Sequence, residues 1–175
     1  MTKDIVYLKL PKNGSSTVRE IFKDYSQLFF YNDYIEFQKD IEPNRSNLIK
    51  FTTIRDPYSR SISSWQHCLK EKWVENISLI DFLNLDFTKK NSVSLYSMPQ
   101  VHYISIIFKN DIDFAIKLEN LEKEFKKFLP FITVTKIKHN PGAYKPYQLS
   151  MDEVQLINKV YSVDFKLLGY DKRNK

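Results

Sequence analysis

The chain has 175 residues, of which 42% are hydrophobic and 27% are charged, so it is long enough for one domain with a buried core. Cys68 is the only cysteine, which excludes an intrachain disulfide and a cysteine-rich metal site. The net charge of +6 fits ordinary solubility, an anionic ligand or a nucleic acid, and does not choose among them.

In the first half of the chain, strand patterns and helix patterns alternate. Residues 4–10 contain the apolar run of a buried strand, and the apolar residues of 15–25 recur at helical spacing. Residues 48–54 predict a second strand, and residues 57–73 predict a long helix with its apolar side chains on one face.

The second half continues the alternation. We expect a short helix from residue 78, a strand over 112–118 and a helix over 119–129. A capping box at Ser150 predicts the start of a last helix. The whole pattern favours an α/β fold in which helices flank a central parallel sheet.

The segment between the first strand and the first helix has the composition of an anion site. It reads Lys9-Leu10-Pro11-Lys12-Asn13-Gly14-Ser15-Ser16-Thr17. Free amide groups at a helix N-terminus attract an anion, glycine allows a close backbone approach, and lysine and hydroxyl groups add donors. An ordinary strand-to-helix turn capped by serine is the alternative. The pattern GxxxxGK[ST] is absent, which disfavours an ATPase or kinase.

A second strand-to-helix junction carries Arg55. Asp56 is the expected N-cap and Pro57 the first helical residue, so Ser63 lies about two turns into the helix. Arg55 and Ser63 are then placed to bind one phosphate from two sides, unless Arg55 pairs with Asp56 and Ser63 only packs. Two such junctions suit a ligand that has phosphates at two separated positions.

At this point the sequence resembles the carbohydrate sulfotransferases that use 3′-phosphoadenosine-5′-phosphosulfate (PAPS). The first junction is similar to the family's 5′-phosphosulfate loop, and the second is similar to its 3′-phosphate motif RDPxxRxxS. Residues 63–67 extend the likeness to the SxWxH stretch of heparan-sulfate 6-O-sulfotransferases. Residues 112–121 and 161–170 resemble two later motifs, "E-[ND]-L" and "Y-x-x-D-F-x-x-x-G-Y", so the resemblance spans nearly the whole chain.

The resemblance implies a P-loop-like, three-layer fold and a set of donor contacts. Lys12 would contact the 5′-phosphosulfate and stabilise charge on the bridging oxygen, and Arg55 with Ser63 would hold the 3′-phosphate. Lys145 is the best match in a loop that the family closes over the donor. The expected donor contacts are Lys12, Asn13, Gly14, Ser15, Ser16, Thr17, Arg55, Ser63 and Lys145.

The catalytic base does not follow the family pattern. Relatives place a His or Glu between the two motifs, but residues 18–54 contain no histidine. Glu36 is our first candidate and Asp33 the second, because both follow an apolar run that could end near the active edge of the sheet. His67, one turn beyond Ser63, and His102 are rivals.

The acceptor side is less defined. Gln100 and His102 are similar to a family stretch near the acceptor, although a helix that begins beside Pro99 would explain them equally well. We expect a sulfotransferase acting on a hydroxyl of a carbohydrate, with PAPS as donor, PAP as product and no metal. A catalytically silent PAP- or PAPS-binding module, a P-loop-type kinase and a basic nucleic-acid-binding protein are the alternatives. Signatures of the last class are absent.

The sequence also predicts where the protein works. Its first residues are charged and lack the apolar run of a signal peptide, and no stretch approaches the roughly 18 apolar residues of a membrane span. We therefore expect a single cytoplasmic domain over residues 1–175, with neither a membrane nor a nucleic acid as partner.

Overall fold

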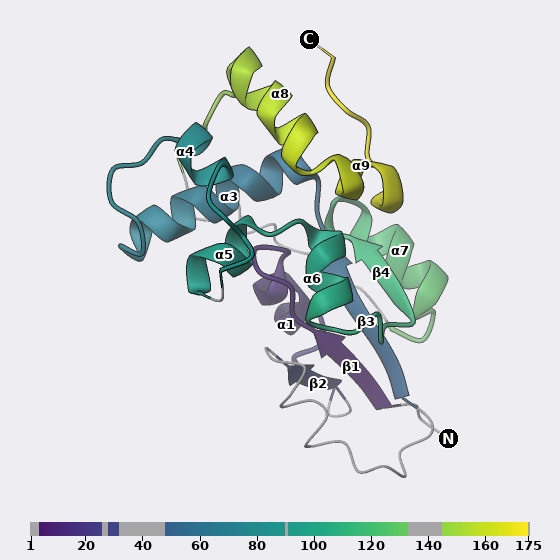
Figure 1. Ribbon diagram of the computed structural model, residues 1–175. Helices are drawn as coiled ribbons and strands as arrows, with labels where there is room; N and C mark the ends of the chain where they lie inside the picture. Colours follow the sequence, from purple (N-terminus) through teal and green to yellow (C-terminus); the bar gives the residue numbers. More distant parts are fainter. Residues whose placement is uncertain (1–3, 26–27, 32–47, 90, 133–144, 175) are drawn as a thin grey trace. The chain divides into compact units, whose positions relative to one another are not determined.

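The computed structural model describes residues 4–25, 28–31, 48–89, 91–132 and 145–174. The chain forms two compact units. The first comprises Met1–Ile54 and Ile104–Asn140, and the second comprises Arg55–Tyr103 and Pro141–Lys175. Figure 1 shows their helices and strands.

A parallel four-stranded sheet forms the centre of the first unit, in the order β2-β1-β3-β4. Ile5 of β1 pairs with Leu28 of β2 on one side and with Ile49 of β3 on the other, and Phe51 of β3 pairs with Phe114 of β4. The strands are β1 (Asp4–Leu8), β2 (Leu28–Tyr31), β3 (Leu48–Ile54) and β4 (Phe114–Lys117). The chain runs from β1 to β2 on one side and then to β3 on the other. The carboxyl ends of β1 and β3 therefore form a topological switch point, where open α/β sheets bind ligands.

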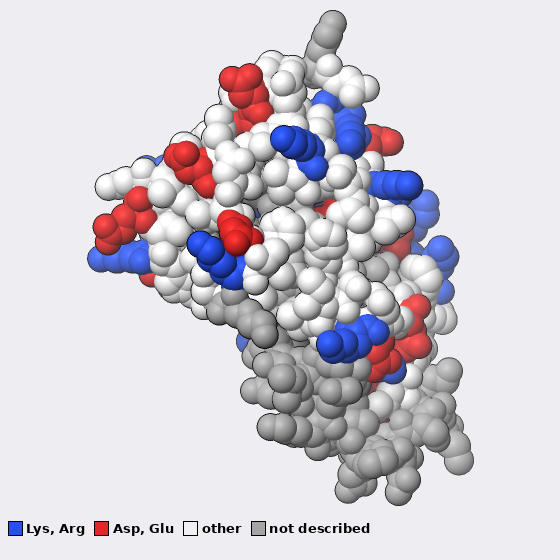
Figure 2. All heavy atoms as spheres, viewed as in Figure 1, with Lys and Arg blue, Asp and Glu red and all other residues white. Residues whose placement is uncertain are grey.

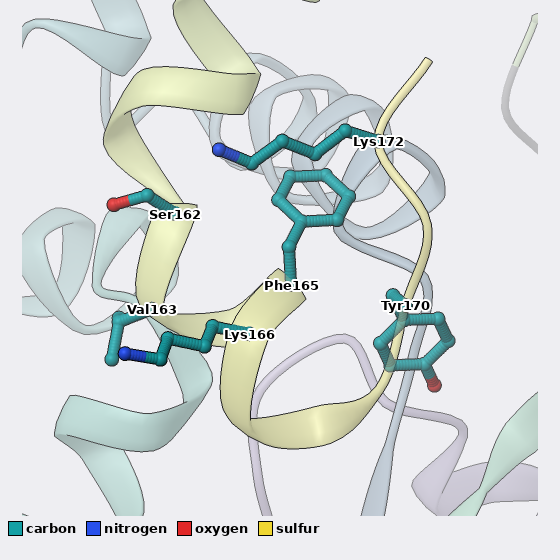
Figure 3. A pocket seen from close by; sticks show the side chains of 6 residues that line it. All are labelled: Ser162, Val163, Phe165, Lys166, Tyr170 and Lys172. Carbon is teal, nitrogen blue, oxygen red and sulfur yellow. The ribbon is translucent and has the colours of Figure 1, made fainter.

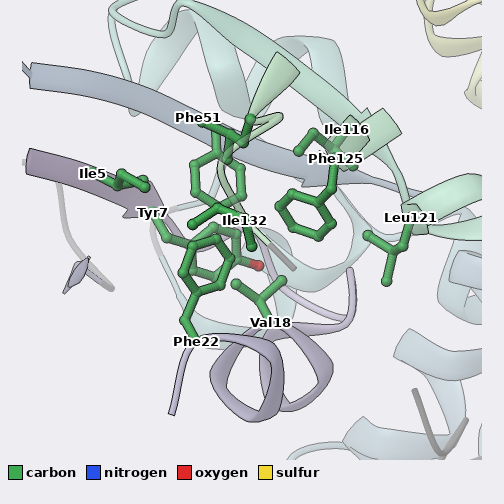
Figure 4. Packing of buried hydrophobic residues seen from close by; sticks show 10 residues of the cluster. Ile5, Tyr7, Val18, Phe22, Phe51, Ile116, Leu121, Phe125 and Ile132 are labelled. Atoms are coloured by element: carbon green, nitrogen blue, oxygen red, sulfur yellow. The ribbon is translucent and has the colours of Figure 1, made fainter. Parts of the chain in front are cut away.

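Aromatic and aliphatic side chains together form the core on one face of this sheet. Two helices, α1 (Ser15–Ile21) and α7 (Leu121–Phe128), contribute to it, and the short 3₁₀ turn η1 (Leu118–Asn120) precedes α7. Phe125 packs edge-on against Phe22 and Phe51, with ring centroids 5.5 and 6.0 Å apart (Figure 4). Each fully buried ring contributes about 1.5–3 kcal/mol. Both helices therefore cover the same face of β1 and β3.

The second unit is built from helices. They are α3 (Pro57–Lys70), α4 (Leu79–Leu83), α5 (Ser92–Ser97), the start of α6 (Gln100–Ile106), α8 (Met151–Val160) and α9 (Ser162–Leu168). Their buried side chains form a separate apolar core, in which Tyr58 of α3 packs against Phe165 of α9 with ring centroids 5.1 Å apart. Cys68 lies in this core and is 0% exposed.

The α/β class with a parallel sheet flanked by helices agrees with the sequence prediction. The predicted caps are also present: the Asp56 carboxylate accepts from the Ser59 amide at 2.8 Å, and Ser78 and Ser150 open capping boxes. The strand over 48–54 has the predicted bounds.

Several ends differ from the prediction. β1 ends at Leu8, because the chain then turns and the Asn13 amide bonds to the Leu10 carbonyl. α1 ends at Ile21 instead of residue 25. α3 ends at Lys70 instead of residue 73, and Lys72, just beyond its end, has a positive φ of 56°. The strand predicted over 112–118 is four residues long. The short helices α5 and α9 were not predicted as helices in their own right, and α6 was expected only as the alternative explanation of Gln100 and His102.

The turn after β1 requires two left-handed residues. Lys12 has a φ of +61° and Gly14 has a φ of +81°. A Cβ atom built on Gly14 would lie 2.4 Å from Cδ1 of Leu118, which is far closer than two carbon atoms approach. Position 14 therefore needs glycine both for its backbone conformation and for the space that Leu118 fills.

Gly14→Ala should destabilise the protein by about 1–2 kcal/mol from the left-handed backbone alone, with a further cost from the contact with Leu118. Urea unfolding measures the change. Leu118→Ala should cost less in the Gly14→Ala background than in the wild type, because it removes the overlap. A Gly14→Ala protein as stable as the wild type would contradict this account of the turn.

Candidate functional site

The loop after β1 is fastened to the end of β3 by a pair of reciprocal hydrogen bonds. The Asn13 side-chain amide donates to the Thr53 carbonyl at 2.7 Å, and the Thr53 hydroxyl donates to the Asn13 carbonyl at 2.5 Å. Tyr7 of β1 shares a further hydrogen bond of 2.8 Å with the Thr53 hydroxyl. All three side chains are buried, and burial raises the pKa of Tyr7. The loop is therefore held in one position over the carboxyl ends of β1 and β3.

Positive charge gathers around this loop. Burial lowers the pKa of Lys9, and the charges of Arg19 and Lys12 lower it further. The positive charges of Arg19 and Lys12 therefore lie close enough to Lys9 to repel it, and an anion beside Lys9 would be attracted by all three. The first turn of α1, which follows at once, adds the hydroxyls of Ser15, Ser16 and Thr17.

The second predicted junction follows β3 directly, and its residues belong to the second unit. Arg55 is half-buried, and Asp56 is occupied as the N-cap of α3. The Asp56 carboxylate accepts from the Ser59 amide at 2.8 Å, as expected of an N-cap. Ser63 is the seventh residue of α3 and is 6% exposed.

Gln100 has a different position from the one expected of an acceptor contact. Its side chain is 0% exposed, and both ends of its amide are bonded to the backbone of Arg55: Oε1 accepts from the amide at 2.9 Å and Nε2 donates to the carbonyl at 2.8 Å. Gln100 is also the first residue of α6, as the alternative interpretation requires. The structure therefore gives Gln100 an internal role beside Arg55.

His67 lies in an aromatic cluster near the end of α3. Its ring stacks on Tyr96 at 5.0 Å and meets the edge of Trp73 at 5.4 Å, and its Nδ1 lies 3.9 Å from the Glu71 carboxylate. Trp73 is 42% exposed, so part of this cluster faces solvent. Packing explains these contacts without catalysis, and His67 stays a candidate base.

The other predicted residues are only partly described. His102 is half-buried with its ring 5.7 Å from that of Phe87. The side chain of Lys145 is exposed, while its carbonyl accepts a 2.9 Å hydrogen bond from Gln66, one turn beyond Ser63 on α3. Asp33, Glu36 and the closing loop over residues 136–144 lie outside the described residues.

An open pocket of about 580 Å³ lies at the C-terminal end of the chain. Figure 3 shows Lys172 extended alongside the Phe165 ring, with its ammonium 5.9 Å from the ring centroid. The lining is Ser162, Val163, Phe165, Lys166, Tyr170 and Lys172. Its two lysines suit an anion, but none of the residues that the resemblance assigns to the donor lies among them.

The surface does not present one dominant charge. On the face shown in Figure 2, basic and acidic side chains are interspersed over the described residues. Within the described ranges, no three or more His, Cys, Asp or Glu side chains gather where they could hold a metal ion. None of the helices in the described parts of the chain has the length and apolar character needed to cross a membrane.

Comparison with known proteins identifies the family. A model of the Sulfotransferase family matches residues 1–171, which include both junctions. The crystal structure of a sulfotransferase from Alicyclobacillus acidocaldarius has a similar fold: the match covers 98% of this chain and 97% of that one, with a TM-score of 0.55 and 10% sequence identity. No curated protein matches the sequence. Because the family match covers nearly every residue, this chain belongs to the sulfotransferase family.

Proposed function

We propose that this protein is a single-domain, PAPS-dependent O-sulfotransferase and that its acceptor is a carbohydrate. The observation that carries the proposal is the family match over residues 1–171, because sulfotransferases generally take their sulfuryl group from PAPS. The two junctions supply the groups that such a donor requires. The carbohydrate acceptor is supported by the likeness of residues 55–67 to heparan-sulfate 6-O-sulfotransferases.

The loop after β1 is assigned to the 5′-phosphosulfate. Its backbone is fixed by Asn13 and Thr53, so donors on the loop are ordered before the ligand arrives. An anion bound beside Lys9 offsets the repulsion that this lysine experiences from Arg19 and Lys12. In this proposal Lys12 contacts the bridging oxygen, and residues 13–17 contribute backbone and hydroxyl donors.

Arg55 and Ser63 are assigned to the 3′-phosphate, the group that distinguishes PAPS from donors related to ATP. A guanidinium offers two parallel donors to a phosphate, and the Ser63 hydroxyl adds another. The backbone of Arg55 is held by Gln100, which supports a defined position for its side chain. Lys145, whose backbone is bonded to α3, is assigned to the donor as well.

The proposed reaction is an in-line transfer. The acceptor oxygen forms a bond to sulfur while the bond between sulfur and the bridging oxygen breaks. The electron pair of that bond stays on the departing PAP, where Lys12 stabilises it, and the acceptor proton passes to the base. Glu36, Asp33 and His67 are the candidates for the base, and His102 is the candidate acceptor contact.

The first expected result concerns the donor. A ligand at about 100 times its dissociation constant stabilises a protein by roughly 2.7 kcal/mol. 3′,5′-ADP, which is PAP, should therefore raise the melting temperature clearly more than 5′-AMP, which lacks the 3′-phosphate. Arg55→Ala should weaken 3′,5′-ADP binding by roughly 1.5–3 kcal/mol in calorimetry, because it removes a charge-assisted contact. Arg173→Ala, on the C-terminal tail, is the matched control. Equal shifts with both nucleotides would refute the 3′-phosphate assignment.

Lys12 should act on the rate more than on binding. Its proposed contact is with charge that develops as the sulfuryl group leaves, and such a contact stabilises the transition state more than the ground state. Lys12→Ala should therefore lower turnover of labelled PAPS, measured as PAP release, by a larger factor than it weakens 3′,5′-ADP binding. Lys23→Ala, which removes an exposed lysine just after α1, should change neither turnover nor 3′,5′-ADP binding. Losses of equal size in turnover and binding would contradict the role of Lys12 in the transition state.

The base should be separable from the donor site. Removing a general base typically lowers the rate by about 10²–10⁴, so one of Glu36→Gln, Asp33→Asn and His67→Phe should do so with 3′,5′-ADP affinity unchanged. Phenylalanine keeps the stacking on Tyr96 and removes only the ring nitrogens. The assay uses labelled PAPS with neutral polysaccharides, uronic-acid polysaccharides and tyrosine peptides. Full activity in all three variants would exclude these candidates. A protein that binds 3′,5′-ADP and sulfates none of the acceptors would be a silent donor-binding module.

A further inference from the structure

A series of buried hydrogen bonds in the second unit ends on the backbone of Arg55. Gln100 bonds both to the amide and to the carbonyl of Arg55, as a neighbouring strand would. Arg55 follows the last residue of β3 and precedes the N-cap of α3, so it belongs to neither regular element. The Gln100 side chain thus supplies the backbone hydrogen bonds that a sheet or a helix would otherwise give.

Asp164 of α9 holds Gln100 in turn. One carboxylate oxygen accepts from the Gln100 amide at 2.8 Å and lies 3.4 Å from its Nε2, and the other accepts from the Val101 amide at 2.9 Å. Asp164 is 0% exposed. Burial raises its pKa, while these hydrogen bonds and the charge of Arg60 favour the ionised form. A buried carboxylate therefore caps α6 and orients the residue that clamps Arg55.

Two more buried side chains hold the segment that leads into α6. Arg60 of α3 is 1% exposed and donates to the Met98 carbonyl at 2.9 Å. Tyr161 donates to the Ser97 carbonyl at 2.8 Å, and burial raises the pKa of its hydroxyl to about 12. Every step of the network is thus a hydrogen bond made by a side chain that solvent hardly reaches. Such a network is costly to leave half-satisfied, so it holds one arrangement.

We propose that Gln100 and Asp164 are positioning residues for the 3′-phosphate: Asp164 orients Gln100, and Gln100 fixes the backbone from which the Arg55 guanidinium reaches the ligand. This inference rests on the proposed function of Arg55 and gives Gln100 a role in donor recognition in place of acceptor binding. Fixing the backbone before binding removes part of the ordering cost that the ligand would otherwise meet.

Gln100→Met tests the first step, because methionine keeps the length of the side chain and removes both hydrogen bonds to Arg55. Its affinity for 3′,5′-ADP should fall about tenfold, whereas its affinity for 5′-AMP, which lacks the 3′-phosphate, should stay within about twofold. Gln155→Met, on the exposed side of α8, is the matched control and should change neither. In the Arg55→Ala background, Gln100→Met should have no further effect on 3′,5′-ADP binding, since the side chain it positions is gone.

Asp164→Asn tests the second step, because it keeps the size of the side chain but turns one acceptor into a donor facing a backbone amide. It should lower affinity for 3′,5′-ADP selectively and in the same direction. Equal losses for both nucleotides, unchanged affinity for 3′,5′-ADP, or additive effects with Arg55→Ala would overturn the proposal. Failure of both variants to fold would also overturn it, by making the network a determinant of folding alone. If the wild type itself does not distinguish 3′,5′-ADP from 5′-AMP, the proposed function fails instead.

Discussion

The reciprocal pairing of Asn13 with Thr53 is the constraint on which the first unit depends. β1 and β3 lie side by side in parallel, and each is followed by a segment that must leave the sheet. Two short hydrogen bonds join Asn13, in the loop after β1, to Thr53 near the end of β3. They fix the place where the chain leaves the sheet after β1. The role proposed for Lys12 depends on that position, since its left-handed conformation costs free energy that the surrounding contacts must offset.

In the second unit, polar groups in the interior have a comparable role. Arg60, Asp164 and Gln100 are nearly inaccessible to solvent, and two of their helices, α3 and α9, also contribute apolar residues to the core. Buried charges cost free energy unless hydrogen bonds compensate them. Here Arg60 donates to the Met98 carbonyl between α5 and α6, and Asp164 accepts from the first two amides of α6. These directional hydrogen bonds therefore fix the path of residues 97–101, which nondirectional apolar contacts would fix less strictly.

The sequence predicted the parallel α/β class, the helix caps and the strand β3, because each depends on local patterns: apolar runs, an Asp-Pro pair, and serine followed three residues later by an acid. Helix ends were less predictable, since no glycine or proline marks Ile21 or Lys70 as the last residue of its helix. The anion loop was visible as a string of residue types, but its attachment to Thr53 was not, because the two partners are 40 residues apart.

The role of Asp164 was harder to foresee. It follows Tyr161 by three residues and precedes Phe165 by one, so it stands on an apolar helix face, where an acidic residue needs a buried partner. That signal was present, but it could not name the partner, because Gln100 is 64 residues away. Gln100 was noticed for its likeness to an acceptor stretch, and the structure instead bonds it to the backbone of Arg55.

The burial of Cys68 has a practical meaning for studying this protein. It is the chain's only thiol, and it lies at 0% exposure in the core shared by α3, α4, α8 and α9. A thiol reagent reaches it only when that core opens, so the rate of labelling reports how easily the core opens, whether locally or by unfolding of the whole chain. Cys68 is thus a natural single-site probe for opening of the core around α3, and no engineered cysteine is needed.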